Sequence, residues 1–181
     1  MLKELNFTST PVYQKLKEEI FSNRLPLYRE TKQGPAYENN DQFAHATWFK
    51  HNLIDRPYTP GPNCVPFPTM TSQYAGAAIN VFEHICALNN IGSHIILRAC
   101  INVLVPGGTL PTHPHIDHPY EHKNVLVYLN DVDGDTVVGD ERSTPREDKV
   151  ILFEGEHYAE LPSSELRTII VFTFLELNDY P

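Results

Sequence analysis

The chain has 181 residues, of which 41% are hydrophobic, and this length and composition fit one domain with a sizeable core. Its 14 basic and 23 acidic residues give a net charge of −9, which disfavours binding to a nucleic-acid backbone. The cysteines, Cys64, Cys86 and Cys100, are widely spaced, so a disulfide framework is not expected. The N-terminus lacks the apolar core of a signal peptide, and no apolar run approaches the ~20 residues of a membrane span. We therefore expect a single cytoplasmic domain over residues 1–181, with no membrane or nucleic-acid partner and an oligomeric state that the composition does not indicate.

The first residues of the chain predict a short strand followed by a helix. Leu5 and Phe7 flank a polar residue and indicate a short edge strand within residues 1–10. Thr10 followed by Pro11 is typical of a helix start, because threonine caps a helix N-terminus and proline suits the first helical position. Apolar residues then recur every four positions, which predicts a helix to about residue 21.

Residues 22–70 are rich in proline, glycine and polar residues and predict little regular structure. A second helix is expected after Thr71 or Ser72, because apolar residues again fall at helical spacing until Asn89 and Gly92 end the pattern. Residues 1–92 are therefore expected to provide helical and loop support for a core formed by the rest of the chain.

From residue 93 to residue 177 the pattern changes to that of a β protein. About six β-branched or aromatic runs, separated by proline and glycine, predict short strands. The predicted fold is mainly β with flanking helices: a double-stranded β-helix, a jelly-roll or cupin-like barrel that closes around a ligand. Residues 139–148 contain almost no apolar side chains, and we expect a mobile surface loop there.

Three residues in this region have the chemistry of a metal site. His115 and Asp117 are two residues apart, so on a strand their side chains point to the same side. His157 follows a later apolar run and a glycine. Two histidines and one carboxylate form the facial triad of non-haem Fe(II) oxygenases, which leaves positions open for cosubstrate and oxygen. Arg167 then opens another apolar strand, where a guanidinium would suit a planar carboxylate.

Taken in this order and spacing, these residues resemble the iron and cosubstrate apparatus of the 2-oxoglutarate/Fe(II)-dependent oxygenases. The segment VLVYLNDVDGDTVV, residues 125–138, is similar to the Tyr-Leu-Asn and Gly-Gly-x-Thr segments of the prolyl-4-hydroxylase-like branch. The resemblance covers residues 98–175. It implies that the iron ligands, and thus the catalytic centre, are His115, Asp117 and His157.

The resemblance also implies a cosubstrate site. Arg167 would bind the distal carboxylate of 2-oxoglutarate, and Tyr128 would donate its hydroxyl to the same group. Asn102 matches an asparagine that lies near the cosubstrate in relatives that demethylate nucleic acids. The chain departs from the family pattern at Asp133, which stands where the first glycine of Gly-Gly-x-Thr is usual, and at two positions where a tyrosine is common, Leu104 and Val105.

The activity implied by the resemblance is that of a dioxygenase, which uses Fe(II), 2-oxoglutarate and O₂ to hydroxylate a substrate and releases succinate and CO₂. Three apolar residues are expected to wall the cavity: Ile169, Val171 and Leu152. A nucleic-acid demethylase would carry a second arginine six residues after the first, where this chain has Thr173. With the acidic charge, this leaves a protein or peptide side chain, or a small amino-acid-like metabolite, as the expected substrate.

Three further histidines lie close in sequence to the His115 and Asp117 pair. In the oxygenase interpretation, His113 is expected to line the mouth of the site or to support a ligand. His118 and His122 are expected to face water.

Two alternatives to the oxygenase interpretation remain open at the level of sequence. One is a cupin-type metalloenzyme that does not use 2-oxoglutarate. Its metal would be held by His113, His115, Glu121 and His157, with no role for Arg167, although the spacing departs from both cupin motifs. The other is a non-catalytic β-barrel that keeps the fold and serves as a binding protein.

Overall fold

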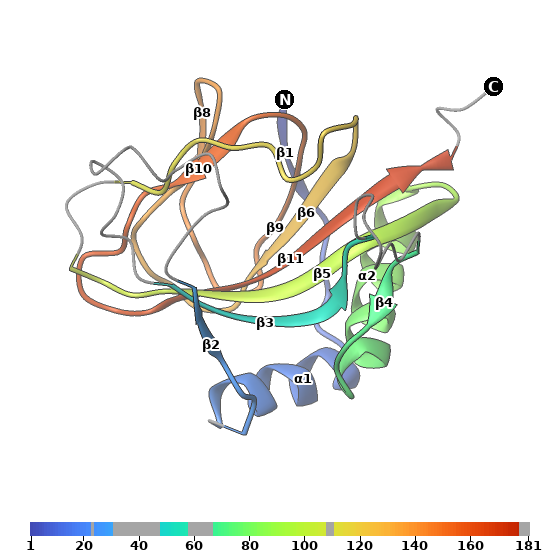
Figure 1. Cartoon of the computed structure of the whole chain (residues 1–181), viewed down its shortest axis with the longest axis horizontal. Helices are drawn as coiled ribbons and strands as arrows, with labels where there is room; N and C mark the ends of the chain where they lie inside the picture. The colour runs from blue at the N-terminus through green and yellow to red at the C-terminus, as the bar shows by residue number, and fades with distance from the viewer. Residues whose placement is uncertain (23, 31–47, 58–66, 108–110, 178–181) are drawn as a thin grey trace, which may run out of the picture.

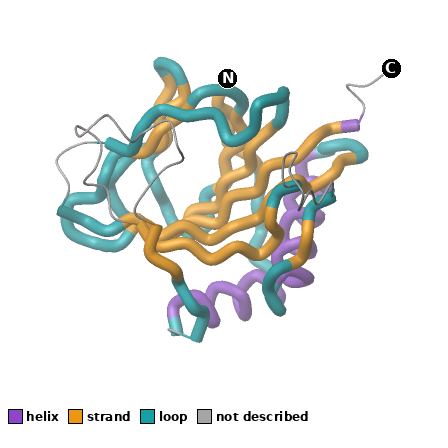
Figure 2. Tube along the Cα trace, viewed as in Figure 1, coloured by secondary structure: helices purple, strands orange, loops and turns teal. Residues whose placement is uncertain are grey.

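The computed structural model describes residues 1–22, 24–30, 48–57, 67–107 and 111–177. In these ranges the chain forms a large sheet, a small sheet that faces it, and two helices that cover the outer face of the large sheet (Figure 1, Figure 2). The fold is thus mainly β with flanking helices, and the two facing sheets form the predicted double-stranded β-helix.

The large sheet has eight strands in the order β1-β9-β6-β11-β5-β3-β2, with β4 paired to β3. Strand β11 lies in the middle of the sheet and pairs antiparallel with β5 on one side and β6 on the other. The strands are β1 (Leu2–Leu5), β2 (Tyr28–Glu30), β3 (Trp48–Asp55), β4 (Thr69–Met70), β5 (His94–Leu104), β6 (Lys123–Tyr128), β9 (Val150–Phe153) and β11 (Arg167–Glu176). Four of these strands, β1 to β4, come from residues 1–92, so this part of the chain builds the sheet and is more than helical and loop support.

The small sheet has the order β10-β7-β8 and consists of β7 (Thr136–Val138), β8 (Glu141–Ser143) and β10 (His157–Ala159). Strand β8 falls within residues 139–148, where the sequence predicted a mobile surface loop. That prediction was wrong for β8, because its backbone pairs with β7 and the side chain of Ser143 is buried despite its polarity. Apolar content alone therefore underestimates a short edge strand.

Both predicted helices are confirmed. Helix α1 spans Pro11–Phe21, and the Thr10 hydroxyl accepts a hydrogen bond from the backbone N–H of Tyr13 at 3.2 Å. Helix α2 spans Ala75–Asn89 and ends at Asn90, whose φ of 54° is in the left-handed region that often terminates helices. With 15 residues, α2 is the longer of the two described helices and is too short to cross a bilayer.

Alternation along the central strands divides their side chains between two apolar clusters. On β11, Ile170 and Phe172 pack with α1 and α2 in the larger cluster. Ile169 and Val171 point to the opposite side, toward the small sheet, and belong to the second cluster. Because side chains alternate across a strand, the same sheet holds the helices on one face and lines an interior space with the other.

Helix α1 is tied to the chain just before β9 by a buried hydroxyl. The Tyr13 hydroxyl donates to Asp148 Oδ1 at 2.5 Å, and Lys17 Nζ lies 2.9 Å from the same oxygen. The Tyr13 side chain has no exposed surface, and its burial and the carboxylate of Asp148 raise the pKa of the phenol. Asp148 itself has a φ of 63°, in the left-handed region, so it lies in a tight turn of the backbone.

Replacing Tyr13 with phenylalanine should lower the free energy of unfolding by about 1–2 kcal/mol, because the hydrogen bond to a carboxylate is lost while the ring stays buried. Urea denaturation followed by circular dichroism would measure the change. Tyr28→Phe is the matched control, since the Tyr28 side chain is 66% exposed. Equal unfolding midpoints for the two variants would show that the contact with Asp148 does not stabilise the fold.

Cys86 and Cys100 are buried free thiols. Cys64 lies outside the described residues.

Candidate metal centre

Between the two sheets lies a cavity of about 270 Å³. Its walls come from the inward faces of the large sheet and from the small sheet, and its apolar lining includes Leu126, Phe153, Ile169 and Val171. Two of the three predicted wall residues, Ile169 and Val171, are therefore confirmed in that position. Leu152 is not, because its place on β9 turns it outward, where it packs against the helix-side cluster.

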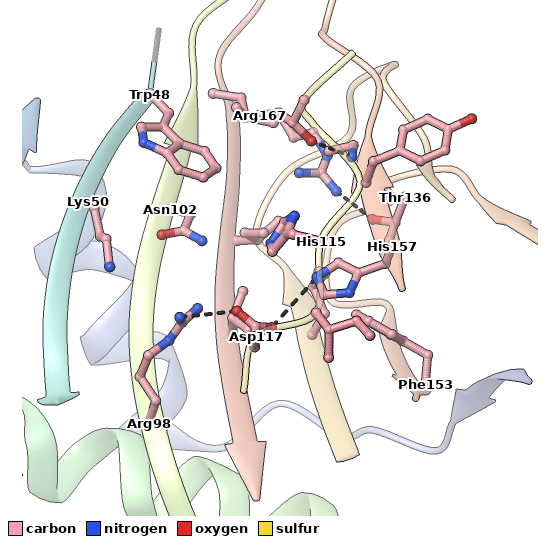
Figure 3. A pocket seen from close by; sticks show the side chains of 18 of the residues that line it. Trp48, Lys50, Arg98, Asn102, His115, Asp117, Thr136, Phe153, His157 and Arg167 are labelled. Carbon is pink, nitrogen blue, oxygen red and sulfur yellow. Dashed lines mark hydrogen bonds and ion pairs between the residues drawn. The ribbon is translucent and has the colours of Figure 1, made fainter. Parts of the chain in front are cut away.

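The cavity contains the His115, Asp117 and His157 side chains (Figure 3). One potential ligand atom from each lies within 4.8 Å of the other two. The backbone fixes this proximity: His115 and His157 form an antiparallel bridge in which each N–H donates to the other's carbonyl oxygen at 3.0 Å. This isolated β-bridge thus brings together two histidines that are 42 positions apart in the sequence.

Hydrogen bonds to backbone carbonyls determine which ring nitrogen of each histidine is free. His115 Nδ1 lies 2.9 Å from the carbonyl oxygen of His113, and His157 Nδ1 lies 3.1 Å from that of Gly155. A carbonyl oxygen only accepts, so each Nδ1 carries a proton, and in the neutral form of either ring the lone pair is on Nε2. Burial lowers the pKa of His157 to about 4, which leaves this ring neutral at pH 7.

Asp117 offers a buried carboxylate oxygen beside these nitrogens. Its Oδ1 is 3.1 Å from Arg98 Nη1, while Oδ2 has no hydrogen-bond partner in the described part of the chain and lies 3.6 Å from His157 Nε2. Burial by itself raises the pKa of this carboxyl, but Arg98 and the nearby histidines outweigh burial and hold the pKa below its usual range. An unpartnered anionic oxygen next to two imidazole lone pairs is the donor set that a divalent transition metal requires.

Arg167 is the second unusual group in the cavity. Its side chain is 1% exposed, and in the described ranges no carboxylate forms an ion pair with it. Its Nη2 donates to the Thr136 hydroxyl at 2.5 Å, its guanidinium lies 5.5 Å from the centre of the Tyr128 ring, and its Nε has no partner there. Burial lowers the pKa of this guanidinium. A buried cation without an anion is costly, so the position suits an anionic ligand.

The structure places Tyr128 behind the cavity wall. Its side chain is fully buried and does not line the cavity, and its hydroxyl donates to the Thr136 hydroxyl oxygen at 2.7 Å and lies 3.1 Å from the Ser143 carbonyl oxygen. Thr136, the threonine of the Gly-Gly-x-Thr-like segment, lines the cavity instead. Direct contact between Tyr128 and a cosubstrate therefore does not follow from the geometry; Tyr128 supports Thr136 and Arg167 from behind.

Asn102 does line the cavity, as the resemblance implies. It lies on β5 opposite Lys50 of β3 and Ile169 of β11. Its Oδ1 is 3.6 Å from the Cys100 sulfur, a weak hydrogen bond along the same strand face. The structure thus brings five of the six predicted site residues to one cavity, and Tyr128 lies directly behind it.

The neighbouring histidines are arranged differently from the expectation. His118 and His122 were predicted to face water, but they are only 4% and 7% exposed. His118 Nε2 bonds the Thr173 hydroxyl at 2.8 Å, and the two imidazole rings meet edge to face. The sequence pattern misleads here because the loop after Asp117 folds back over the end of the barrel.

The ligand set of the cupin alternative is not assembled in the described residues. Glu121 is exposed and lies outside the cavity, and the group of close potential ligands contains neither Glu121 nor His113. His113 contributes its backbone carbonyl, which orients the His115 ring.

Sequence reasoning missed several polar residues of the cavity: Trp48, Lys50, Arg56, Arg98, Thr112 and Thr136. Arg98 had a detectable signal, because it interrupts the apolar run of β5 four residues before Asn102 and so shares its face. Trp48, Lys50 and Arg56 had none, since their place in the cavity depends on the pairing of β3 with β5.

Comparison of the sequence with protein-family models and with curated proteins finds no match. Solved structures do match. A 2OG-Fe(II) oxygenase family oxidoreductase from Burkholderia pseudomallei has a TM-score of 0.65 at 13% identity, with 91% of this chain and 79% of that one covered. A viral collagen prolyl hydroxylase from Paramecium bursaria Chlorella virus-1, in complex with 2OG, has a TM-score of 0.56 at 12% identity, with 96% and 94% covered.

A third similar structure is SnoN, a non-haem α-ketoglutarate-dependent epimerase from nogalamycin biosynthesis. Its TM-score is 0.59 at 14% identity, with 97% of this chain and 77% of that one covered. At these identities the similarity shows the fold. The chain therefore has the double-stranded β-helix fold of the 2-oxoglutarate/Fe(II)-dependent oxygenases, prolyl hydroxylases among them.

Proposed function

We propose that this chain, which has the fold of the 2-oxoglutarate/Fe(II)-dependent oxygenases, is itself a dioxygenase of that type. In this proposal His115, Asp117 and His157 hold Fe(II), and Arg167 binds the distal carboxylate of 2-oxoglutarate. The substrate is a peptide side chain or a small amino-acid-like metabolite, and the reaction is a hydroxylation that releases succinate and CO₂.

One observation carries the proposal: two histidines and a carboxylate, close enough to hold one metal ion, share a cavity with a buried arginine that has no carboxylate partner in the described ranges. A metal site alone would fit many proteins. A buried guanidinium in the same cavity adds a position for a carboxylate, and 2-oxoglutarate has one carboxylate for the metal and another for such a cation.

The bound metal would supply open coordination positions at which the oxo acid and O₂ react. The chain supplies orientation and a dry environment. The backbone bridge between His115 and His157 holds the two imidazoles close together, and the carbonyls that bind each Nδ1 would leave each Nε2 to hold the metal. Arg98 fixes the Asp117 carboxylate through Oδ1 and leaves Oδ2 as the ligand atom.

At the Arg167 end of the cavity, where 2-oxoglutarate would bind, hydrogen bonds also fix the side chains. Thr136 is held between Arg167 and Tyr128, so its hydroxyl and the guanidinium present adjacent donors to one carboxylate. Leu126, Phe153 and Val171 add apolar surface to the cavity lining, and such surface would limit contact of the reacting groups with water.

A cavity of about 270 Å³ is at the small end of ligand sites, so beside 2-oxoglutarate it would admit one side chain or a small molecule. This size is compatible with either proposed substrate class. The similar structures likewise include a prolyl hydroxylase and an epimerase, so their fold alone does not choose between them.

An anaerobic titration tests the proposal. Addition of Fe(II) and then 2-oxoglutarate to the metal-free protein should produce the weak visible charge-transfer band of a chelated oxo acid. Arg167→Met should raise the 2-oxoglutarate concentration needed for this band about 10- to 100-fold, because a charge-assisted pair worth about 1.5–3 kcal/mol is lost. Methionine keeps much of the buried volume without leaving a buried charge.

Arg24→Met is the control, since Arg24 is a surface side chain that is 72% exposed. Iron binding without a band would favour the cupin alternative. Failure to bind iron at all would favour the non-catalytic barrel and would contradict the proposed function.

A further inference from the structure

The cavity carries more positive charge than iron and 2-oxoglutarate would need. Its lining includes Lys50, Arg56 and Arg98 in addition to Arg167, and Asp117 is its only carboxylate in the described residues. We infer that the Arg56 and Arg98 end of the cavity recognises a carboxylate on the substrate. This inference rests on the proposed function and specifies the substrate class as anionic.

The two arginine positions are at opposite ends of the cavity. Arg167 pairs with Leu104 at one end of β5, whereas Arg98 lies six residues away along the same strand. At the rise of a strand this separates their backbones by about 20 Å. Figure 3 shows the two guanidinium groups on opposite sides of the candidate metal ligands, with Arg98 beside Asp117. A 2-oxoglutarate molecule held by Arg167 and the metal would therefore not occupy the Arg98 end.

Charge balance leads to the same conclusion. The charges of Fe(II) and Arg167 would be cancelled by Asp117 and the dianionic 2-oxoglutarate. The charges of Arg98 and Arg56 would then have no balancing carboxylate in the described cavity lining. Arg98 is 7% exposed, so water screens its charge poorly, whereas Arg56 lies at the exposed rim. Asp55 is a further carboxylate whose charge acts on Arg98. It accepts the backbone N–H of Arg56 at 3.0 Å but lies outside the cavity, and in the described residues it forms no ion pair with either arginine.

The guanidinium groups of Arg56 and Arg98 both have N–H donors that form no hydrogen bond in the described residues. Arg56 is exposed, and its Nη1 donates to the Asp117 backbone carbonyl at 3.1 Å, which anchors the side chain at the rim beside the candidate metal. Arg98 is 7% exposed, uses Nη1 for Asp117, and has an Nε with no partner in the described part of the chain. Planar donor forks of this kind match a carboxylate, which two N–H groups can bind at once.

The recognised carboxylate can belong to a free amino or carboxylic acid or to an acidic side chain of a peptide. Two matched pairs of probes separate these sources: L-aspartate with L-asparagine, and N-acetyl-Gly-Asp-Gly-amide with N-acetyl-Gly-Asn-Gly-amide. Each pair differs in charge and hardly in shape. Binding is measured by anaerobic calorimetry on protein loaded with Fe(II) and saturated with 2-oxoglutarate, so the readout does not depend on turnover.

The acid of at least one pair should bind on the order of tenfold more tightly than its amide, as expected for a charge-assisted hydrogen bond worth about 1.4 kcal/mol. Arg56→Gln should abolish most of this preference, and Arg56→Lys should retain part of it. Arg24→Gln, which removes one positive charge far from the cavity, should leave it intact. The 2-oxoglutarate affinity of the Arg56 variants should stay close to that of the wild type.

Equal binding of acid and amide in both pairs, or an acid preference that survives in Arg56→Gln, would overturn the inference. The saturation step with 2-oxoglutarate tests the proposed function separately. If no 2-oxoglutarate binds, that function fails, and the same four probes applied to the metal-free protein still decide whether the Arg56 and Arg98 end selects a carboxylate.

Discussion

Replacing Asp117 with asparagine should weaken Fe(II) binding by more than the ~10–100-fold that loss of a group supporting a metal ligand typically costs. The amide keeps the size of the side chain but removes the only anionic ligand of the three. Asp117 Oδ2 is also the one atom of the set that is buried, charged and without a hydrogen-bond partner in the described residues. An anaerobic Fe(II) titration of the metal-free protein would measure the change.

Asp55→Asn provides a matched control, because it removes a nearby carboxylate that lies outside the cavity. Thermal unfolding of both metal-free variants should accompany the titration, since the loss of a buried partner of Arg98 can itself destabilise the fold. A folded Asp117→Asn variant that binds Fe(II) as tightly as the wild type would show that Asp117 is not a ligand of the metal.

Replacing Gly134 with alanine should lower the free energy of unfolding by about 2–5 kcal/mol. Gly134 has a φ of +91°, which side-chain-bearing residues rarely adopt, and a Cβ there would lie 2.7 Å from the Glu160 carbonyl oxygen. This close approach is part of the turn that leads into β7. In the same turn the Asp135 carbonyl accepts the Glu160 N–H at 2.8 Å, so the backbone cannot move away without breaking a hydrogen bond.

Gly139→Ala separates the steric effect from the backbone effect. Gly139 also has a positive φ, of +57°, but no atom beyond its chain neighbours lies within 4 Å of the position that a Cβ would occupy. Its replacement should therefore cost only about 1 kcal/mol. Chemical denaturation of both variants would provide the comparison, and similar costs would mean that the contact with Glu160 relaxes easily. A destabilised Gly134 variant should also bind 2-oxoglutarate less tightly, because this turn positions Thr136 beside Arg167.

The same turn explains a departure from the family pattern. Asp133 stands at a position where a glycine is usual, and its Oδ1 accepts the backbone N–H of Ser163 at 2.9 Å. The Ser163 side chain and this backbone N–H together lower the pKa of the Asp133 carboxyl, and the contact ties the turn to the segment before β11. Asp133 therefore stabilises the loop and does not enter the cavity.

Some features were determined by the sequence itself because they depend on local chemistry. The helix from Pro11 is specified by a capping threonine, a proline and a four-residue apolar repeat, all within one segment. The two-residue spacing of His115 and Asp117 predicts that both side chains lie on one side of the chain. The structure brings both into the cavity, although the segment forms only a single bridge at His115 and bends at Asp117. With His157 and Arg167 in order behind them, these residues were enough to suggest the fold class, and all four line the cavity.

Other features were decided only by the tertiary structure, because they depend on which strands pair and in which register. Arg56 reaches the cavity because β3 pairs with β5, and nothing in its own neighbourhood indicates this. Tyr128 lies behind the wall because Thr136, on the opposing small sheet, occupies the space in front of it. His118 is buried because its loop closes over Thr173 of the central strand. In each case the environment of the side chain is formed by residues distant in sequence. The local pattern of polar and apolar residues therefore cannot predict that environment.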